Sequence, residues 1–202
     1  MKKPESICVF GDSTAWGAWD LEKGGWVGRL WLHVAKRDKD YVEIYNLSIS
    51  GGTTQTILDR FEDESKIREA DALIFQSGGN DSYLQGRGGP NNIPKEKFRK
   101  NVEEIIERAK KITDKIIFIG FKNVDESRTM PVSWKDIYYM NAELEQYGQI
   151  IEEVCENNDV LYLDIFGLLQ NDDLDDGIHP NASGHQKIFE QVKSFLAQNN
   201  WI

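Results

Sequence analysis

Short apolar runs alternate with longer amphipathic stretches along this chain. The runs are four to six residues long and rich in Val, Ile and aromatic residues, a composition typical of strands buried on both faces. They cover residues 7–10, 42–47, 72–75, 116–121 and 160–163. Between them, apolar residues recur every three or four positions, which predicts helices. These helices cover residues 27–35, 98–109, 144–155 and 188–196, with a weaker one around 57–61.

The repeated strand–helix order predicts an α/β fold, a three-layer α/β/α sandwich built around a five-stranded parallel sheet. Asn181 is placed to cap the last helix. A chain of 202 residues suits one domain, so residues 1–202 are expected to fold as a single unit. In such sheets functional groups gather at the carboxyl ends of the strands, and that edge is where chemistry is expected.

Composition narrows the range of functions. An aromatic content of 11% excludes wholesale disorder. The net charge of −10 repels phosphate backbones, so no nucleic-acid partner is expected. Cys8 and Cys155 form no spaced disulfide framework and are expected to be reduced and buried. No signal for an oligomeric state is present.

The N-terminal region does not match a secretory signal. Lys2 and Lys3 precede an apolar run of only residues 7–10, whereas a signal peptide needs about 7–15 apolar residues. No stretch approaches the roughly 18 apolar residues of a membrane span. The sequence therefore predicts a soluble, cytoplasmic protein with no stable membrane insertion.

Small and polar residues follow the predicted strands. They form the segments 11–13, 46–53, 77–81 and 175–180. The serine in the first segment, Ser13, can act as a nucleophile once a base removes its proton. His179 is the best available base, since imidazole titrates nearest neutrality, and Asp176 lies close enough in sequence to orient it. Ser13, His179 and Asp176 are therefore the predicted catalytic residues.

Acyl transfer also requires hydrogen-bond donors for the oxyanion that develops on the substrate. Gly51 can offer an unobstructed backbone N–H, Asn80 its side-chain amide, and Ser13 its own backbone N–H. Asp12 is expected to hold the turn by hydrogen bonds rather than take part in the chemistry. The predicted reaction needs no metal and no cofactor.

Taken together, four segments resemble the conserved blocks of the SGNH (GDSL) hydrolase superfamily. ICVFGDS at residues 7–13 resembles the first block, NLSISGGT at 46–53 the second, SGGND at 77–81 the third, and DGIHPN at 176–181 the fifth. The resemblance is nearest to the small bacterial thioesterase/esterase type. It implies a flavodoxin-like fold and a serine esterase, lipase or acylhydrolase with a catalytic triad. By position it implies Ser13 as nucleophile, Gly51 and Asn80 as oxyanion donors, and Asp176 with His179 as the remaining triad members.

Two departures from the family pattern leave every catalytic group in place. Thr14 follows the GDS motif where Leu or Ile is usual, and Gly52 stands where Asp is common. Some members of the superfamily work with a Ser–His dyad, so the resemblance requires His179 in every case and Asp176 only in members with a triad.

The substrate is predicted only by class, as a small-molecule ester or thioester. No long apolar lid is apparent, which favours short acyl groups, including those of acetylated carbohydrates. Residues 84–94 and 122–136 are expected to shape the mouth of the pocket as loops after strands. The predicted substrate contacts are Trp16, Arg87 and Trp134, with Trp19 and Trp26 as further candidates for a pocket wall.

Other polar groups near these segments are given structural interpretations. His33 and His185 fall within helical periods and are expected to be surface or packing residues. In the run Asp172, Asp173, Asp175 and Asp176, every carboxylate except Asp176 is expected to be solvated, because the spacing lacks the closing Glu of a calcium loop.

The alternative function is a non-catalytic, flavodoxin-like binding module for a small ligand such as a nucleotide. Such a module would carry a glycine-rich phosphate loop with a lysine, which this sequence lacks. Asp12 in the first strand–helix loop would also repel phosphate. An α/β-hydrolase is disfavoured because no G-x-S-x-G motif occurs.

Overall fold

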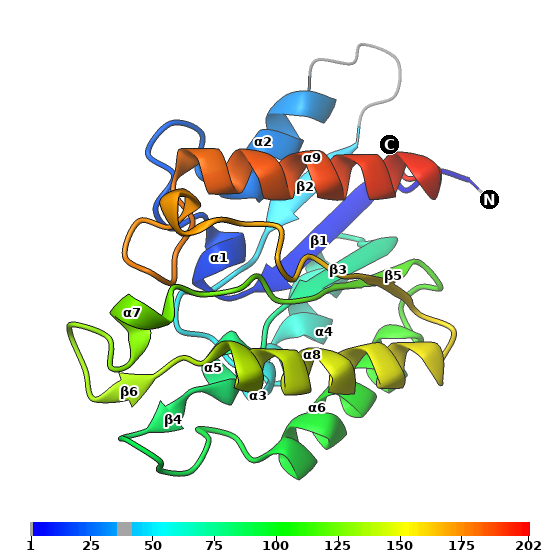
Figure 1. Cartoon of the computed structure of the whole chain (residues 1–202). Coiled ribbons are helices and arrows are strands. Elements are labelled where there is room, and N and C mark those ends of the chain that lie inside the picture. The colour runs from blue at the N-terminus through cyan, green and yellow to red at the C-terminus, as the bar shows by residue number, and fades with distance from the viewer. Residues whose placement is uncertain (1, 36–41) are drawn as a thin grey trace.

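Five parallel strands form the central sheet of the computed structural model, which describes residues 2–35 and 42–202. The strand order is β2-β1-β3-β5-β7 (Figure 1). The strands are β1 (Ser6–Gly11), β2 (Glu43–Asn46), β3 (Ala72–Gln76), β5 (Ile116–Ile119) and β7 (Leu161–Leu163). Each coincides with a predicted apolar run, so the predicted five-stranded parallel sheet is confirmed.

Alternate residues of each central strand enter two separate hydrophobic cores. In β1, Cys8 and Phe10 face one core, whereas Ile7 and Val9 face the other. The same alternation holds along β3 and β5. Successive strand side chains point to opposite faces, so apolar residues at every position are required when both faces are covered.

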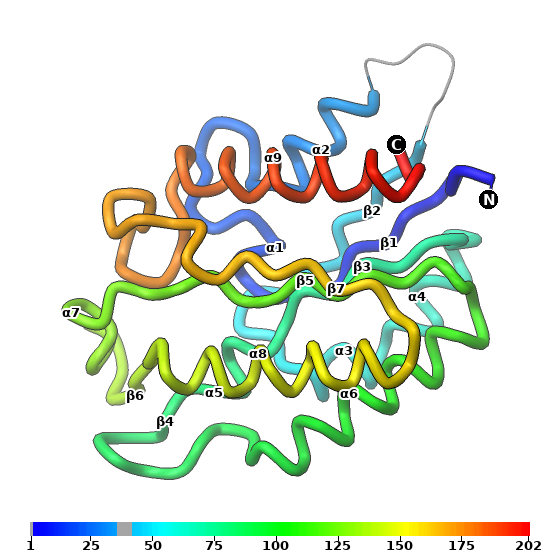
Figure 2. Tube along the Cα trace, turned by 45° about the vertical axis from the view of Figure 1, so that its right-hand side comes forward, coloured from blue at the N-terminus to red at the C-terminus, as the bar shows by residue number. Residues whose placement is uncertain are grey.

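Helices cover both faces of the sheet and make three layers (Figures 1 and 2). One face carries α2 (Gly25–Val34) and α9 (Ala182–Gln198), and the other carries α3 (Thr54–Leu58), α4 (Phe61–Ile67), α6 (Lys95–Ala109) and α8 (Asn141–Glu156). Asn181 caps α9 as predicted, because its side chain accepts hydrogen bonds from the N–H groups of Ser183 and Gly184. The helix expected around residues 57–61 is instead two short helices, α3 and α4.

Several short elements lie in the loops above the carboxyl ends of the strands, and the apolar pattern did not predict them. Segments of two to four residues are too short to show a hydrophobic period. They are α1 (Ser13–Trp16), α5 (Gly79–Ser82), β4 (Leu84–Gln85), α7 (Glu126–Thr129), β6 (Ile137–Tyr138) and the 3₁₀ helix η1 (Asn171–Asp173).

Both cysteines are free and fully buried, as expected. Burial raises the pKa of Cys8 and of Cys155 to about 12, so both remain thiols. None of the helices formed by the described residues combines the length and hydropathy needed to cross a bilayer.

The prediction that Asp173 is solvated is wrong. Asp173 is 4% exposed and accepts hydrogen bonds from Lys187 Nζ, Ser183 Oγ and the backbone N–H of Gln170. Its carboxylate fixes η1 to the first turns of α9. The run of acidic residues concealed this role because its partners come from a helix that begins nine residues later.

Candidate active site

Ser13 lies where β1 meets α1. Gly11 ends the strand, and a Cβ there would lie 2.6 Å from the Gln76 carbonyl oxygen, so the close approach of β1 to β3 requires glycine. Asp12 caps α1 by accepting a hydrogen bond from the Thr14 N–H at 2.9 Å, which confirms its expected turn-holding role. This tight turn places Ser13 at the first position of α1, just beyond the carboxyl end of β1.

His179 and Asp176 lie on one tight segment between η1 and α9. Gly177 between them has a φ of +94°, a conformation that side chains rarely tolerate. His179 Nε2 is 2.9 Å from Ser13 Oγ, and His179 Nδ1 is 2.6 Å from Asp176 Oδ2. The structure thus brings together, in one row of hydrogen bonds, three side chains that the sequence separates by up to 166 positions.

Asp176 is held in its charged form. Burial acts to raise its pKa, but hydrogen bonds from the His179 ring and from the backbone N–H groups of His179 and Ile178 outweigh burial and keep the pKa well below its usual range. The indole N–H of Trp19 also donates to Asp176 Oδ2, at 3.2 Å. A charged Asp176 fixes the orientation of the imidazole, with Nε2 facing Ser13.

Asn80, in α5, is oriented by its neighbours. The Tyr139 hydroxyl donates to Asn80 Oδ1 at 2.7 Å, and burial raises the pKa of Tyr139, so this hydroxyl keeps its proton. The Asn80 amide nitrogen therefore points the other way and donates to the Gly52 carbonyl at 2.9 Å, leaving its second hydrogen for a further acceptor. Gly51, next to Gly52, has a φ of +76°, and a Cβ there would meet no atom within 4 Å.

Asp81, beside Asn80, is fully buried and gives the first testable prediction. Burial raises its pKa to about 6 from 3.8, against hydrogen bonds from the hydroxyl and N–H of Thr54. Because the pKa of Asp81 is higher in the folded protein than in the unfolded chain, its contribution to the free energy of unfolding is complete below the unfolded pKa. That contribution is lost as the pH rises through the folded pKa. Relative to Asp81→Asn, the wild-type free energy of unfolding should fall by about 3 kcal/mol across this range. Denaturant unfolding at several pH values measures it; parallel profiles for the two proteins would contradict it.

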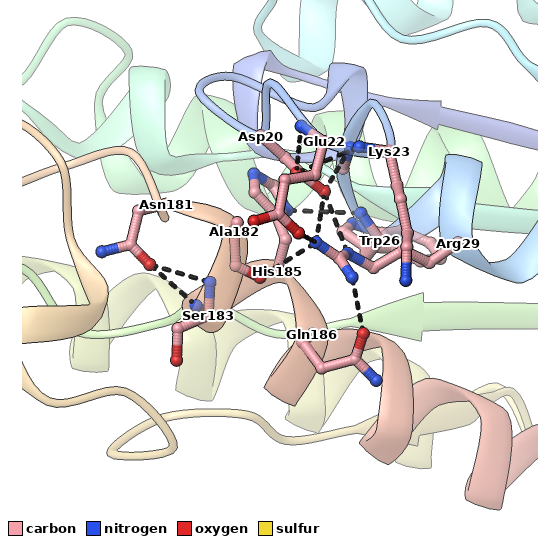
Figure 3. Close-up of polar contacts among 12 residues, drawn as sticks. Asp20, Glu22, Lys23, Trp26, Arg29, Asn181, Ala182, Ser183, His185 and Gln186 are labelled. Carbon is pink, nitrogen blue, oxygen red and sulfur yellow. Dashed lines mark hydrogen bonds and ion pairs between the residues drawn. The ribbon is translucent and has the colours of Figure 1, made fainter.

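A buried ion pair ties the loop after α1 to the start of α9 (Figure 3). Arg29, from α2, places Nε and Nη2 each 2.9 Å from Asp20 Oδ2. Its Nη1 donates to Gln186 Oε1 at 2.6 Å and its Nη2 to the Ala182 carbonyl at 3.1 Å, both on α9. Burial acts to raise the pKa of Asp20, but Arg29 and the backbone N–H groups of the loop outweigh it and lower the pKa. The loop that follows Ser13 is thereby fixed to the helix that follows His179.

His185 reinforces this connection from α9. Its Nε2 donates to the Ala18 carbonyl at 2.9 Å, and its Nδ1 accepts the Trp26 N–H at 3.3 Å. Burial lowers the pKa of His185 to about 4, so the ring is neutral. The expectation of a packing histidine is confirmed.

A pocket of about 540 Å³ opens beside Ser13 and His179. Trp134 lines it and stacks on the His179 ring, with ring centroids 6.4 Å apart. Trp16 is half exposed and Arg87 is exposed, and neither lines this pocket. Trp26 is fully buried and bonds Gln76, so the prediction that it forms a pocket wall is wrong. Of the two loops expected at the mouth, residues 122–136 contribute to the lining and residues 84–94 do not.

Comparison with known proteins assigns the chain to a family. The model of the GDSL-like lipase/acylhydrolase family matches residues 9–187, which include the three hydrogen-bonded side chains. The chain belongs to the GDSL-like lipase/acylhydrolase family. As a member, it is a hydrolase of ester bonds.

One curated relative and two solved structures match this GDSL-like hydrolase over most of its length. The Bacillus subtilis protein YpmR is 23% identical over 210 residues, covering 92% of this chain and 79% of YpmR. The lipase/acylhydrolase from Enterococcus faecalis superposes with a TM-score of 0.79 at 22% identity, covering 96% of each chain. The acetylxylan esterase Axe2 from Geobacillus stearothermophilus gives 0.75 at 19% identity, covering 96% of this chain and 94% of Axe2. These two structures share the fold described above.

The sequence analysis placed residues 122–136 of this GDSL-like hydrolase at the pocket mouth but did not single out Lys122. Lys122 lines the pocket although it is only 7% exposed. It comes directly after the predicted strand 116–121, so the rule that functional groups gather at strand ends could have found it. Within the described residues, no group of three or more His, Cys, Asp or Glu side chains could hold a metal ion.

Proposed function

We propose that this chain is a serine hydrolase that cleaves carboxylic esters or thioesters of short acyl groups through a Ser13–His179–Asp176 triad and an acyl-enzyme. The observation that carries the proposal is the row of hydrogen bonds from Ser13 Oγ through the imidazole of His179 to Asp176. Each member has the neighbour that its role requires: a nucleophile beside a base, and a base beside a charged orienting group.

Acylation begins when Ser13 Oγ attacks the substrate carbonyl carbon and His179 Nε2 takes the hydroxyl proton. The resulting oxyanion accepts hydrogen bonds from the Ser13 and Gly51 N–H groups and from the Asn80 amide. Tyr139 supports this role of Asn80, because its hydroxyl donates a hydrogen bond to the amide oxygen. The amide nitrogen of Asn80 then has a hydrogen available for the oxyanion. As the intermediate collapses, His179 returns the proton to the departing alkoxide or thiolate.

Deacylation repeats these steps with water as the nucleophile. His179 Nε2 takes a proton from water, which attacks the acyl carbon, and then returns a proton to Ser13 Oγ. The charged Asp176 stabilises the imidazolium in both halves of the reaction. No step requires a metal or a cofactor.

The pocket supports a preference for short acyl groups. It combines apolar walls from Phe121, Val124 and Leu144 with polar groups at Lys122 and Asn80. Its volume of about 540 Å³ includes space that is open to solvent, and only a small part is enclosed, which favours a short acyl group over a long chain. Trp134, at 55% exposure, provides an aromatic rim of the kind that contacts an alcohol or sugar leaving group.

A fluorophosphonate probe tests the proposed nucleophile. We expect a single covalent adduct on Ser13, identified by peptide mass spectrometry, because a hydroxyl activated by His179 attacks phosphorus. A non-catalytic binding module would not be labelled. An adduct on another residue, or none, would contradict the proposed triad.

A series of ethyl esters from acetate to dodecanoate tests the acyl preference. We expect kcat/KM to be highest for acyl chains of two to about four carbons and to fall for longer chains, since the pocket limits their length. A maximum at the long end of the series would refute this preference and leave the triad intact.

Trp19 is expected to position Asp176. Its indole N–H bonds Asp176 Oδ2, and its ring packs edge-on against His179 with centroids 5.7 Å apart. Trp19→Phe keeps an aromatic ring and removes the donor, so kcat should fall about threefold to tenfold, the value of one hydrogen bond. Trp31→Phe is the matched control, because Trp31 is also 47% exposed but lies on α2. Equal kcat values for the two variants would count against a positioning role.

A further inference from the structure

Lys122 is a buried cation in the pocket beside the proposed nucleophile. It follows β5 at the carboxyl edge of the sheet and is 7% exposed. In the described part of the chain, no residue forms a hydrogen bond or an ion pair with its ammonium group. A buried ammonium group without a partner is costly, and proteins keep such groups mainly where a ligand or a reaction uses them.

The two carboxylates whose charges act on Lys122 make their hydrogen bonds with other groups. Asp12 Oδ1 accepts the Thr14 N–H, and Asp176 bonds both His179 and Trp19. They act on Lys122 only through their charge. Burial lowers the pKa of Lys122 to about 8, and both carboxylates counteract that shift, so the group is largely an ammonium ion at neutral pH. Lys122, a cation without a hydrogen-bond partner among the described residues, therefore belongs to the lining of the pocket that the substrate enters.

We propose that the substrate of this hydrolase carries a carboxylate or a comparable anionic group, and that Lys122 binds this group inside the pocket. The proposal rests on the proposed ester hydrolysis and adds the chemical class of the substrate. The anion can belong to the acyl part, as in a hemiester of a dicarboxylic acid, or to the alcohol part, as in the acetyl ester of a hydroxy acid.

The charge distribution of the chain makes Lys122 decisive for such a substrate. The net charge is −10, so the molecule as a whole repels anions. Selection for an anionic ester must therefore come from a local cation. Because Lys122 is only 7% exposed, a charge-assisted hydrogen bond to its ammonium group is stronger than one at the surface. Asp12 also lines the pocket and repels anions, so an anionic group of the substrate can bind there only where it contacts Lys122.

Two pairs of esters test the proposal and locate the anion. Ethyl butyrate and monoethyl succinate differ by a carboxylate in the acyl part; propyl acetate and 3-acetoxypropanoate differ by one in the alcohol part. Wild type should show a lower KM for the anionic member of at least one pair. Lys122→Met keeps most of the length of the side chain without its charge. It should raise the KM of that anionic ester by about tenfold to 100-fold more than it changes the KM of the neutral ester of the same pair. Lys100→Met, on the exposed surface of α6, makes the same charge change as a control and should leave every KM unchanged.

Each outcome bears on one of the two proposals. A Lys122→Met effect confined to monoethyl succinate assigns the anion to the acyl part, and one confined to 3-acetoxypropanoate assigns it to the alcohol part. Two outcomes would overturn the role of Lys122 while leaving the proposed function intact, provided that the neutral esters are hydrolysed. In the first, wild type shows no preference for the anionic esters. In the second, Lys122→Met changes the KM of all four esters equally. If wild type hydrolysed none of the four esters and Ser13 also failed to react with fluorophosphonate, the proposed function itself would be wrong.

Discussion

Ser13→Ala should lower kcat for a short-chain ester by about 10⁴-fold to 10⁶-fold, the loss expected when the nucleophile of a triad is removed. The variant should fold normally, because the Ser13 side chain makes its hydrogen bond only to His179 among the described residues and alanine fits the same position in α1. The expected variant thus has an intact fold without hydrolysis. Steady-state kinetics and a denaturant unfolding curve, measured on the same preparation, check both parts.

A buried serine remote from the site provides the control for this change. Ser65, in α4, is fully buried, and its hydroxyl has no hydrogen-bond partner in the part of the chain that the structure describes. Ser65→Ala removes the same atom and should leave kcat unchanged. If Ser13→Ala kept more than about a tenth of the wild-type kcat, the nucleophile would have to be a different group.

Asp20→Ala should lower the free energy of unfolding by about 3–5 kcal/mol, more than any other variant proposed for this protein. The change leaves a buried guanidinium group without its carboxylate. The side chains of Asp20 and Arg29 are 0% and 4% exposed. Asp20 also accepts the backbone N–H groups of Glu22, Lys23 and Gly25, all of which would lose their acceptor. The free energy of unfolding, measured in urea, gives the cost.

Two further variants make this result interpretable. Asp20→Asn keeps an acceptor for the backbone N–H groups but removes the charge, so its cost should be smaller than that of alanine. Glu22→Ala removes the exposed carboxylate that lies 3.7 Å from Arg29 Nη2, and it should change stability by less than about 1 kcal/mol. If Asp20→Ala were no less stable than Glu22→Ala, the buried pair would not be important for the fold.

The fold was predictable because strands buried on both faces leave an unambiguous pattern. Each of β1, β3, β5 and β7 coincides with a continuous apolar run, whereas the run at the edge strand β2 is interrupted by Glu43 and Asn46. The two cores accept alternate residues such as Val9 and Phe10. The proposed triad was predictable for a related reason. The carboxyl ends of parallel strands meet at one edge, so Ser13 after β1 and the segment after β7 that holds Asp176 and His179 were expected at that edge. The choice of these three side chains also used their chemistry and the family resemblance.

Side-chain partners across long sequence separations could not be predicted in the same way. Asp173 looked like one member of an acidic run, but Lys187 and Ser183 make it a buried anchor. Asp20 and Arg29 carry no periodic signal, since each takes its partners from loop backbone or from α9. Trp26 lies in the helical period of α2, where the sequence cannot distinguish a core face from a pocket wall. These assignments depend on which surfaces meet, and only the packed structure fixes that.

The two native thiols have a practical consequence for measuring substrate entry. Cys8 and Cys155 are inaccessible and stay protonated, so neither should react with maleimide while the chain is folded. A single cysteine introduced by Trp134→Cys at the pocket rim would then be the one reactive sulfur. A fluorophore attached there could report arrival and departure of ligands in real time without prior mutation of the wild-type cysteines.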